Sequence, residues 1–339
     1  MEILVTGGTG NVGRTTVARL VRHGHKVRVI GRRAGISIES ADYRVCDVTD
    51  FDRLREQVRG VQAIVHLAAI PHPSLGPGQE IFRVNCVGTF NVYQAAADEG
   101  IKRIVTASSI NALGYNFGIK SFELRYFPID EEHPSFTTDA YSFSKQVLEE
   151  TAAYFWRREG ISSVCLRLPA VYEIDDRRTG LKEFVSRSRH SYQEFLALPH
   201  AVQEARVRQL ISAFETLRAQ RTWEKPLKRW GMDLPDAGLM FGRNNFWTSI
   251  NAEDSTQAIE KGLLVEYEGS HPIYVNDSHN FVGAKTQTLA GIFYPEVKTW
   301  KRPIKGTESL VSIDKARTLI GFEPQHSVSE WFESDSPKQ

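Results

Sequence analysis

The sequence predicts an α/β protein built on a doubly wound parallel sheet, joined to a smaller, largely helical C-terminal lobe. Apolar runs rich in valine and isoleucine alternate with helical stretches through the first half of the chain, which is typical of parallel strands buried on both faces. From about Asp175 the sequence becomes polar and charged, with helical periodicity. With 339 residues, 41% of them hydrophobic, the chain can bury a large core in one or two joined domains.

The expected elements follow one another at short intervals. Strands are expected at Ile3–Thr6, Lys26–Ile30, Tyr43–Cys46, Ala63–Leu67, Arg103–Ala107 and Ser163–Leu168. Helices are expected between them at Asn11–His23, Asp50–Val58, Val84–Glu99 and Ala140–Glu159. A return to the sheet is indicated by strand-like Trp247–Ile250 and Pro272–Val275 around a helix at Asp254–Leu264. We therefore predict a sheet of seven strands.

The first expected strand runs straight into a glycine-rich turn. The turn reads Thr6-Gly7-Gly8-Thr9-Gly10-Asn11-Val12-Gly13 and opens the first expected helix. Glycine at every third position lets backbone amides approach a diphosphate at the helix N-terminus, where the helix dipole favours an anion. The strand before and the helix after separate this pattern from an ordinary tight turn. It predicts a Rossmann-type dinucleotide site, with cofactor contacts at Gly7, Thr9, Gly10, Asn11, Val12 and Gly13.

A long helical region separates the two parts of the predicted sheet. Between 182 and 223, apolar residues recur at helical spacing: Phe184, Phe195, Leu210, Phe214 and Leu217. Such a stripe needs a surface to cover, so we expect a helical cap, with a partner-binding helix as the alternative. We predict a dinucleotide-binding domain at 1–172, its sheet completed by about 247–277, and a substrate-binding lobe made of 173–246 and 278–335.

A tyrosine and a lysine stand four positions apart at the start of the helix expected from Ala140. This spacing places Tyr141 and Lys145 on one helix face, about one turn apart. A phenol, with a reference pKa of about 10, is a poor base at neutral pH, but an adjacent positive charge favours the phenolate. Such a pair is usually a solvent-facing one; after a dinucleotide motif it predicts an acid–base centre.

Between these two motifs, the strand Arg103–Ala107 runs out into a loop of small residues. Ser108 and Ser109 follow the strand at its carboxyl end, the edge of a parallel sheet at which ligands bind. A hydroxyl there can donate to a substrate oxygen as charge develops on it. Two serines after a strand are also ordinary turn residues.

The motifs as a set resemble the extended short-chain dehydrogenase/reductase superfamily, which includes NAD(P)-dependent sugar epimerases, dehydratases and reductases. The resemblance is close over 1–172 and loose over 247–331. It is carried by Thr6–Gly13, Asp47-Val48, His66-Leu67-Ala68-Ala69, Val84-Asn85, Ser108-Ser109 with Gly114, Tyr141 with Lys145, and Leu166–Tyr172.

The resemblance implies roles for individual residues. Tyr141 would be the general acid/base, Lys145 would hold the nicotinamide ribose and lower the tyrosine pKa, and Ser109 would polarise the reacting hydroxyl or carbonyl. The implied cofactor contacts are completed by Asp47 and Val48 at the adenine, by Leu67, Ala68, Ala69 and Pro169 in the cleft, and by Asn85, which would also support the active-site helix.

Charge at the end of the second strand bears on the choice of dinucleotide. An NAD-selective site has an acidic residue there that accepts from the ribose hydroxyls, whereas this chain has Gly31-Arg32-Arg33. Guanidinium groups are suited to binding a 2′-phosphate. We therefore expect NADP(H) in preference to NAD(H), held by Arg32 and Arg33; the alternative is that both arginines simply face water.

Departures from the superfamily pattern narrow the reaction. Ile110 and Asn111 replace the Asp-Glu pair of the dehydratases, and Ala170–Glu173 lacks the Asn and Gly-Pro of many nucleotide-sugar enzymes. The loop after Ser108 is loosely similar to that of uronate dehydrogenases. We predict an NAD(P)-dependent oxidoreductase that interconverts a hydroxyl and a carbonyl on a small sugar-like or polyol substrate. A cofactor-retaining sugar epimerase and a non-catalytic dinucleotide sensor remain as alternatives.

Two further sets of side chains are candidates for substrate contacts, although each member equally suits a structural role. The candidates for binding a substrate carboxylate are His72, Arg125, His133 and Arg243. The candidates for an apolar pocket wall are Tyr115, Phe117, Tyr126, Phe127, Phe246 and Trp247.

Composition bears on partners and location. Forty-two basic against 41 acidic side chains give no overall field for nucleic acid or anionic lipid, and neither a signal sequence nor a membrane-length apolar run is evident. Cys46, Cys86 and Cys165 are far apart, which suits buried thiols in a reducing compartment better than a metal site or disulfides. We expect a cytoplasmic enzyme that needs no metal and, from the resemblance alone, a homodimer.

Overall fold

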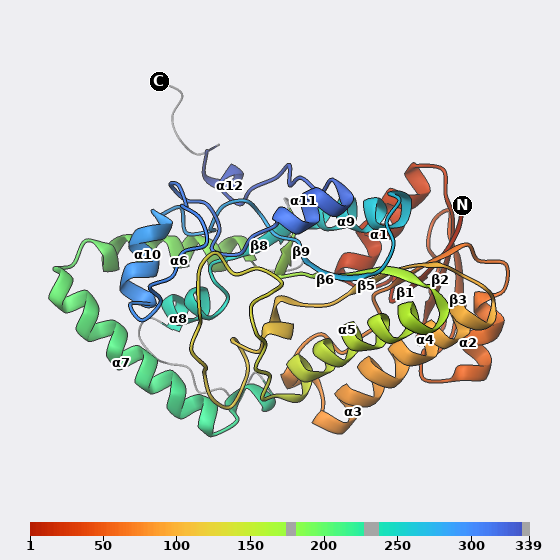
Figure 1. Cartoon of the computed structure of the whole chain (residues 1–339), viewed down its shortest axis with the longest axis horizontal. Helices are drawn as coiled ribbons and strands as arrows, with labels where there is room; N and C mark the ends of the chain where they lie inside the picture. The colour runs from red at the N-terminus through yellow and green to blue at the C-terminus, as the bar shows by residue number, and fades with distance from the viewer. Residues whose placement is uncertain (174–180, 227–236, 334–339) are drawn as a thin grey trace.

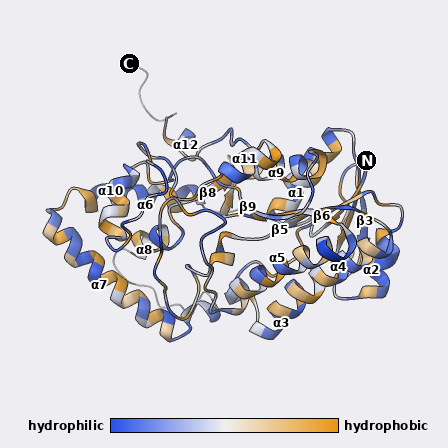
Figure 2. Cartoon of the chain, viewed as in Figure 1, coloured by the Kyte–Doolittle hydropathy of each residue, from blue (hydrophilic) through white to orange (hydrophobic). Residues whose placement is uncertain are grey.

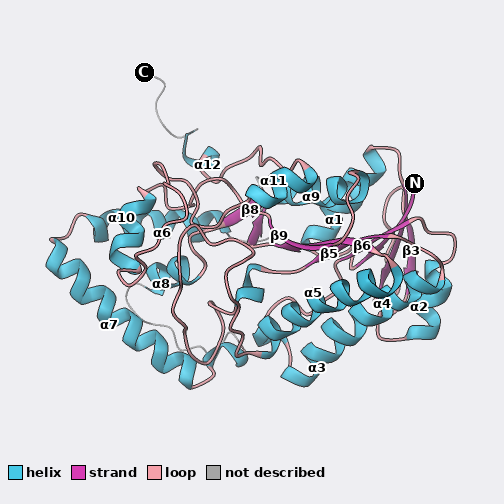
Figure 3. Cartoon of the chain, viewed as in Figure 1, coloured by secondary structure: helices cyan, strands magenta, loops and turns pink. Residues whose placement is uncertain are grey.

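The computed structural model describes residues 1–173, 181–226 and 237–333, and its centre is one parallel sheet (Figure 3). The seven strands lie in the order β3-β2-β1-β4-β5-β6-β9. Their bounds are β1 Glu2–Thr6, β2 Lys26–Gly31, β3 Asp42–Val45, β4 Ala63–His66, β5 Arg103–Ala107, β6 Ser162–Arg167 and β9 Ser270–Tyr274. The predicted doubly wound sheet of seven strands is confirmed.

Helices cover both faces of the sheet (Figure 1). One face carries α1 (Asn11–Arg22), α9 (Ala252–Leu264) and α11 (Asp314–Ile320), and the other carries α2 (Phe51–Val58), α4 (Gly88–Asp98) and α5 (Ala140–Glu159). Alternate residues of one strand pack against the helices on opposite faces of the sheet, because successive side chains of a strand point to opposite sides. In β1, Ile3 and Val5 pack towards α1 and α9, whereas Leu4 packs towards α2 and α4.

The helical lobe lies beyond one end of the sheet (Figure 1). It contains α6 Leu181–Leu196, α7 His200–Ala219, α8 Ala237–Asn244, α10 Thr286–Phe293 and α12 Glu330–Glu333. Its core is rich in buried aromatic side chains, among them Tyr192, Phe214, Trp247, Phe293 and Tyr294. Figure 2 shows mixed hydrophobic and hydrophilic colour along α7, as expected for a helix with one covered face. The lobe is helical as predicted; the domain boundaries remain a prediction.

Two predicted elements differ in the structure. The helix expected at Val84–Glu99 begins earlier, as α3 (Gly78–Phe82), and passes through one π-helical turn at 83–87 before α4. The strand expected at Trp247–Ile250 is β8 (Ser249–Asn251), which pairs with β7 (Ala170–Tyr172) and does not enter the main sheet. The chain bends before β8, where Phe246 and Trp247 adopt φ of 54° and 53°.

Candidate active site

A cavity of about 1230 Å³ opens at the carboxyl ends of the central strands, the edge of a parallel sheet at which ligands bind. Apart from Asn85, the residues predicted to bind the cofactor or act in catalysis all line it: Gly7, Thr9, Gly10, Asn11, Val12, Gly13, Arg32, Arg33, Asp47, Val48, Leu67, Ala68, Ala69, Ser109, Tyr141, Lys145 and Pro169. The fold therefore brings together motifs that lie more than 100 positions apart in the sequence.

The glycines of the turn leave no room for a Cβ at Gly7 or Gly13, and no side chain caps the first amides of the helix that follows. A Cβ at Gly13 would lie 2.3 Å from the carbonyl oxygen of Gly7, and Gly7 itself has φ of +70°. Gly10, which precedes α1, supplies no side-chain hydrogen bond to the first amides of the helix. These amides and the helix dipole fit a dinucleotide diphosphate, because they are the groups that bind phosphate at a helix N-terminus.

The end of the cavity next to β2 carries the two adjacent arginines. Arg32 and Arg33 are exposed, and Nη2 of Arg33 donates to Oγ1 of Thr9 at 3.3 Å. Asp47 accepts from both the backbone and the hydroxyl of Thr49 at 2.9 Å, which fixes its side chain at the cavity edge. Asp42 in β3 is ion-paired with a neighbouring arginine at 2.7 Å and does not line the cavity.

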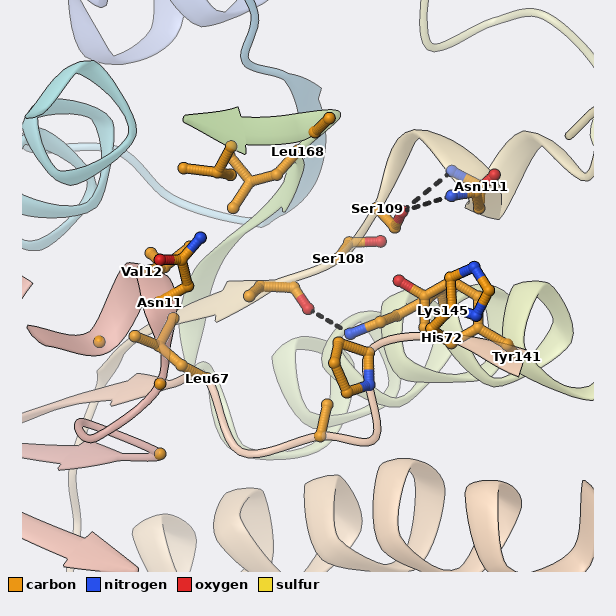
Figure 4. Close-up of a pocket in the computed structure, with 18 of the residues that line it drawn as sticks. Asn11, Val12, Leu67, His72, Ser108, Ser109, Asn111, Tyr141, Lys145 and Leu168 are labelled. Atoms are coloured by element: carbon orange, nitrogen blue, oxygen red, sulfur yellow. Dashed lines mark hydrogen bonds between the residues drawn. The ribbon is translucent and has the colours of Figure 1, made fainter. Parts of the chain in front are cut away.

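The opposite end of the cavity carries the tyrosine–lysine pair of α5. Asp139 caps this helix by accepting from the amide of Ser142 at 2.8 Å, which fixes where the helix begins. Nζ of Lys145 donates to the carbonyl oxygen of Ala107 at 2.8 Å, as Figure 4 shows, and lies 5.9 Å from the centre of the Tyr141 ring. Burial lowers the pKa of Lys145 to about 8.

The pKa of Tyr141 is set mainly by burial. Burial raises it to about 12, opposed by the hydrogen bond to Ser109 and reinforced by the charge of Asp139. Burial of the phenol outweighs the other effects in this arrangement, in which the ammonium of Lys145 is bound to a backbone carbonyl. At neutral pH the Tyr141 hydroxyl is therefore a proton donor. A lowering of this pKa by Lys145 stays a prediction.

The two serines after β5 have different surroundings. Ser109 accepts from the backbone amide and the Nδ2 of Asn111, at 3.1 and 3.2 Å, so its own proton is left to donate (Figure 4). Ser108 instead donates to Glu149 at 2.6 Å, and this carboxylate is bound by Arg167 at 2.8 and 2.9 Å. Ser108 thus belongs to a buried polar network, and Ser109 is the hydroxyl that faces Tyr141.

Asn85 does not line the cavity. Its Nδ2 donates to the hydroxyl of Ser144 on α5 at 2.9 Å, and its Oδ1 accepts from the amide of Ile70 at 2.7 Å. The side chain therefore connects the loop after β4 to the helix that carries Tyr141. Asn85 is thus positioned to support that helix, and its predicted contact with the cofactor stays a prediction.

Of the four candidates for binding a carboxylate, only His72 lines the cavity. Burial lowers its pKa to about 4, so the ring is neutral at pH 7. Arg125 is exposed outside the cavity, and His133 accepts from the Arg125 amide at 3.0 Å. Arg243 is buried and donates to the carbonyl of Phe293 at 2.9 Å, so it serves the core of the helical lobe.

The helical lobe contributes a wall that the sequence did not reveal. Of the predicted aromatic residues, Phe117 lines the cavity, while Tyr115, Phe127, Phe246 and Trp247 are buried in the lobe core. Tyr126 donates to Asp130 away from the cavity. The lobe and its flanking loops supply Asn116, Phe184, Val185, Phe241, Asn245 and Phe281. No local pattern marks these residues as lining a cavity, because their shared position depends on how distant segments pack.

A family model, "NAD dependent epimerase/dehydratase family", matches residues 3–210, well over half of the chain. The chain belongs to this family. It is an enzyme of the extended short-chain dehydrogenase/reductase superfamily, as the sequence motifs predicted, with an NAD(P) dinucleotide as its cofactor.

Curated relatives in this family include sugar dehydrogenases. A uronate dehydrogenase of Pseudomonas syringae is 29% identical over 187 residues, which cover 55% of this chain and 65% of the relative, just under two thirds. An L-arabinose 1-dehydrogenase (NAD(P)(+)) of Haloferax volcanii is 32% identical over 195 residues, 56% of this chain and 74% of the relative. The similarity thus lies in part of each chain.

Solved structures share the fold at low sequence identity. A short-chain dehydrogenase/reductase superfamily protein from Agrobacterium tumefaciens with bound NAD has a TM-score of 0.65 at 21% identity, covering 98% of this chain and 95% of that one. A UDP-glucose 4-epimerase from Thermotoga maritima has a TM-score of 0.62 at 18% identity, covering 98% and 99%. These likenesses confirm the architecture.

The structure also bears on the expectations drawn from composition. Cys46, Cys86 and Cys165 are buried and unpaired, as predicted, and burial raises the pKa of each thiol. Over the described ranges, no three acidic, histidine or cysteine side chains are grouped to hold a metal ion. None of the helices described is long and apolar enough to cross a membrane.

Proposed function

We propose that this enzyme is an NAD(P)-dependent dehydrogenase or reductase that interconverts a hydroxyl and a carbonyl group on a small, uncharged, sugar-like or polyol substrate. The observation that carries the proposal is the grouping of Ser109, Tyr141 and Lys145 in the cavity that the glycine turn also lines. The L-arabinose 1-dehydrogenase among the relatives supports the substrate class.

The residues at the reacting end divide the chemistry between them. Tyr141, protonated at neutral pH, transfers a proton to the carbonyl oxygen during reduction and removes it during oxidation. Ser109 donates a hydrogen bond to the same oxygen as negative charge develops there. Lys145 is held at the Ala107 carbonyl, where it would contact the nicotinamide ribose. Bound NAD(P) supplies or accepts the hydride.

An uncharged substrate follows from the groups on the substrate side. Among the described lining residues, Lys145 is the only lysine or arginine away from the Arg32–Arg33 end, and it is bound to a carbonyl. The remaining lining groups there are aromatic and aliphatic side chains, hydroxyls, amides and the neutral His72, none of them a cation. A carboxylate in such surroundings would lose hydration without gaining a cation. We therefore expect aldoses to be better substrates than uronates.

The preference for NADP(H) over NAD(H) is also proposed. Arg32 and Arg33 lie at the cavity edge after β2, and none of the described carboxylates takes the usual ribose-binding position beside them. Guanidinium groups there favour a 2′-phosphate. Arg33→Ser should weaken NADPH binding at least about tenfold and leave NADH binding nearly unchanged; equal effects on the two dinucleotides would contradict the assignment.

We also propose a homodimer formed through the exposed face of α4 and α5. Large apolar side chains lie on this face although it is solvent-exposed: Phe82, Val87, Phe90, Phe143 and Tyr154. The rings of Phe82 and Phe143 stack at 5.8 Å, which makes the patch continuous between α3 and α5. A patch of this kind marks an interface. Sedimentation of a monomer at micromolar concentration would exclude it.

The test of the proposed reaction is an absorbance screen at the nicotinamide band, with both dinucleotides against aldoses, uronates and polyols. Tyr141→Phe should abolish turnover and leave cofactor affinity within about threefold, because only the proton-transfer group is lost. Tyr126→Phe, which removes a hydroxyl that donates to Asp130 away from the cavity, is the matched control. Full activity in Tyr141→Phe would refute the mechanism.

The same screen separates the two remaining alternatives. An epimerase of this family would convert a sugar without net change in the dinucleotide, and product analysis would detect this. A dinucleotide sensor would bind cofactor and give neither signal. The intact group of Ser109, Tyr141 and Lys145 at the cavity supports a catalytic role over a sensor.

A further inference from the structure

A buried arginine of α7 is bound to the loop that follows the candidate catalytic serine. Arg218 is 1% exposed; its Nη2 donates to the carbonyl of Tyr115 at 2.7 Å and its Nη1 to the carbonyl of Gly118 at 3.2 Å. One turn earlier on α7, Glu215 accepts from the amide of Ser121 at 3.1 Å and pairs with Arg218 at 3.2 Å. One turn of α7 therefore holds this loop at three points.

The loop held in this way, residues 115–121, is named here the wall loop. Two of its side chains, Asn116 and Phe117, line the cavity. The Phe117 ring meets the Tyr141 ring edge-on at 6.0 Å and the His72 ring at 4.7 Å. Phe117 thus forms the apolar wall beside the group that transfers the proton.

The chemistry of the guanidinium explains why an arginine stands here. A buried cation loses its hydration and is tolerated only where acceptors replace the lost water. The planar fork of Arg218 reaches two carbonyls at once, and Glu215 offsets its charge. A lysine has three donors on a single nitrogen and lacks the fixed planar fork that places separate nitrogens at the two carbonyls.

The same helix also supports a second part of the cavity wall. Phe214, one turn before Arg218, packs edge-on against Phe241 of α8 at 5.7 Å, and Phe241 lines the cavity. In Figure 1, α7 is the long helix at the outer edge of the lobe. Its connection to the cavity on this side runs through the buried Phe214 and the partly buried Phe241. The helix therefore connects to both the wall loop and the α8 wall.

We propose that Arg218 is a positioning residue: it fixes the wall loop through Tyr115 and Gly118, and so sets Phe117 against Tyr141 at the reacting end of the cavity. This gives the helical region a part in orienting the substrate and excluding water. The expected effect of Arg218 on kcat and KM rests on the proposed function. The anchoring of the wall loop by Arg218 does not depend on which reaction the enzyme catalyses.

The kinetic test compares three variants on one helix. Arg218→Met removes the donors, Arg218→Lys keeps the charge, and Arg208→Met alters a side chain that is 71% exposed. With the best substrate of the screen, we expect kcat/KM to fall about 100-fold in Arg218→Met, through both kcat and KM. Arg218→Lys should be intermediate, Arg208→Met unchanged, and the Kd for NADPH within about twofold in all three.

A role in stability alone gives a different result. A purely structural role would lower the thermal midpoint of Arg218→Met. The kcat per folded molecule and the KM, both measured well below that midpoint, would then match those of the wild type. That outcome overturns the proposal. If Arg218→Met does not fold, the same comparison of kcat, KM and thermal midpoint is made with Arg218→Lys.

A second measurement needs no substrate. Lys120 is an exposed trypsin site within the wall loop, so cleavage after this residue reports how firmly the loop is held. Cleavage should be faster in Arg218→Met and Arg218→Lys than in Arg208→Met; equal rates refute the anchoring. If the wild type transfers hydride with no compound of the screen, the proposed function fails while this measurement still decides on the anchor.

Discussion

We expect the protein to lose about 2 kcal/mol of folding stability through His66 alone when the pH falls from 8 to 5. His66 is 2% exposed at the end of β4. The Thr6 oxygen accepts from the amides of Leu67 and Ala68 at 3.1 Å, so its proton is donated to Nδ1 of His66 at 2.8 Å. Protonation of Nδ1 would break this bond.

The magnitude follows from the pKa in the folded and unfolded states. Burial, followed by the charge of Lys145, lowers the pKa of His66 from 6.5 to about 3. Below pH 6.5 the unfolded chain therefore takes up a proton that the folded protein does not bind until about pH 3, and stability falls with pH across this window. A pH of 5 lies about 1.5 units below the pKa of His66 in the unfolded chain. At about 1.36 kcal/mol per unit, this difference lowers the free energy of unfolding by about 2 kcal/mol.

Urea unfolding followed by circular dichroism at pH 8 and pH 5 tests this value in the wild type and in His66→Gln. Glutamine can accept from Thr6 and donate on its other side, but it does not titrate. The wild type should lose about 2 kcal/mol more than the variant. His72, whose pKa is also lowered by burial, is present in both proteins and cancels. Equal losses would refute the reasoning.

Two further substitutions test the cofactor site and the buried network. Gly13→Ala places a Cβ 2.3 Å from a carbonyl oxygen, so the affinity for NADPH, measured by fluorescence titration, should fall at least about tenfold. The control is Gly291→Ala, because nothing lies within 4 Å of a Cβ at that position. Equal NADPH affinities in the two variants would count against this account of the turn. Glu149→Gln leaves Arg167 buried without its charge partner and should cost about 3–5 kcal/mol by thermal denaturation. Exposed Glu150→Gln should cost little, and a similar small loss at Glu149 would contradict the role of the pair.

Much of the dinucleotide half could be predicted from the sequence, because its signals are local. The glycine turn is defined by backbone conformation within a few residues, and the four-residue spacing of Tyr141 and Lys145 places both on one helix face in any context. The strands were identifiable as short apolar runs because parallel strands are buried on both faces. The carboxyl-end rule then located Ser109 at the cavity.

The part of the cavity next to the helical lobe was decided mainly by tertiary structure. Phe117, Phe184 and Phe281 share one cavity although they lie on distant segments, while the equally aromatic Trp247 is buried in the lobe core. The raised pKa of Tyr141 also depends on how deeply the folded chain buries the phenol and on where Lys145 finds its carbonyl. Local spacing determines which side chains share a helix face, but long-range packing determines their burial and neighbours, and these set the chemistry of the site.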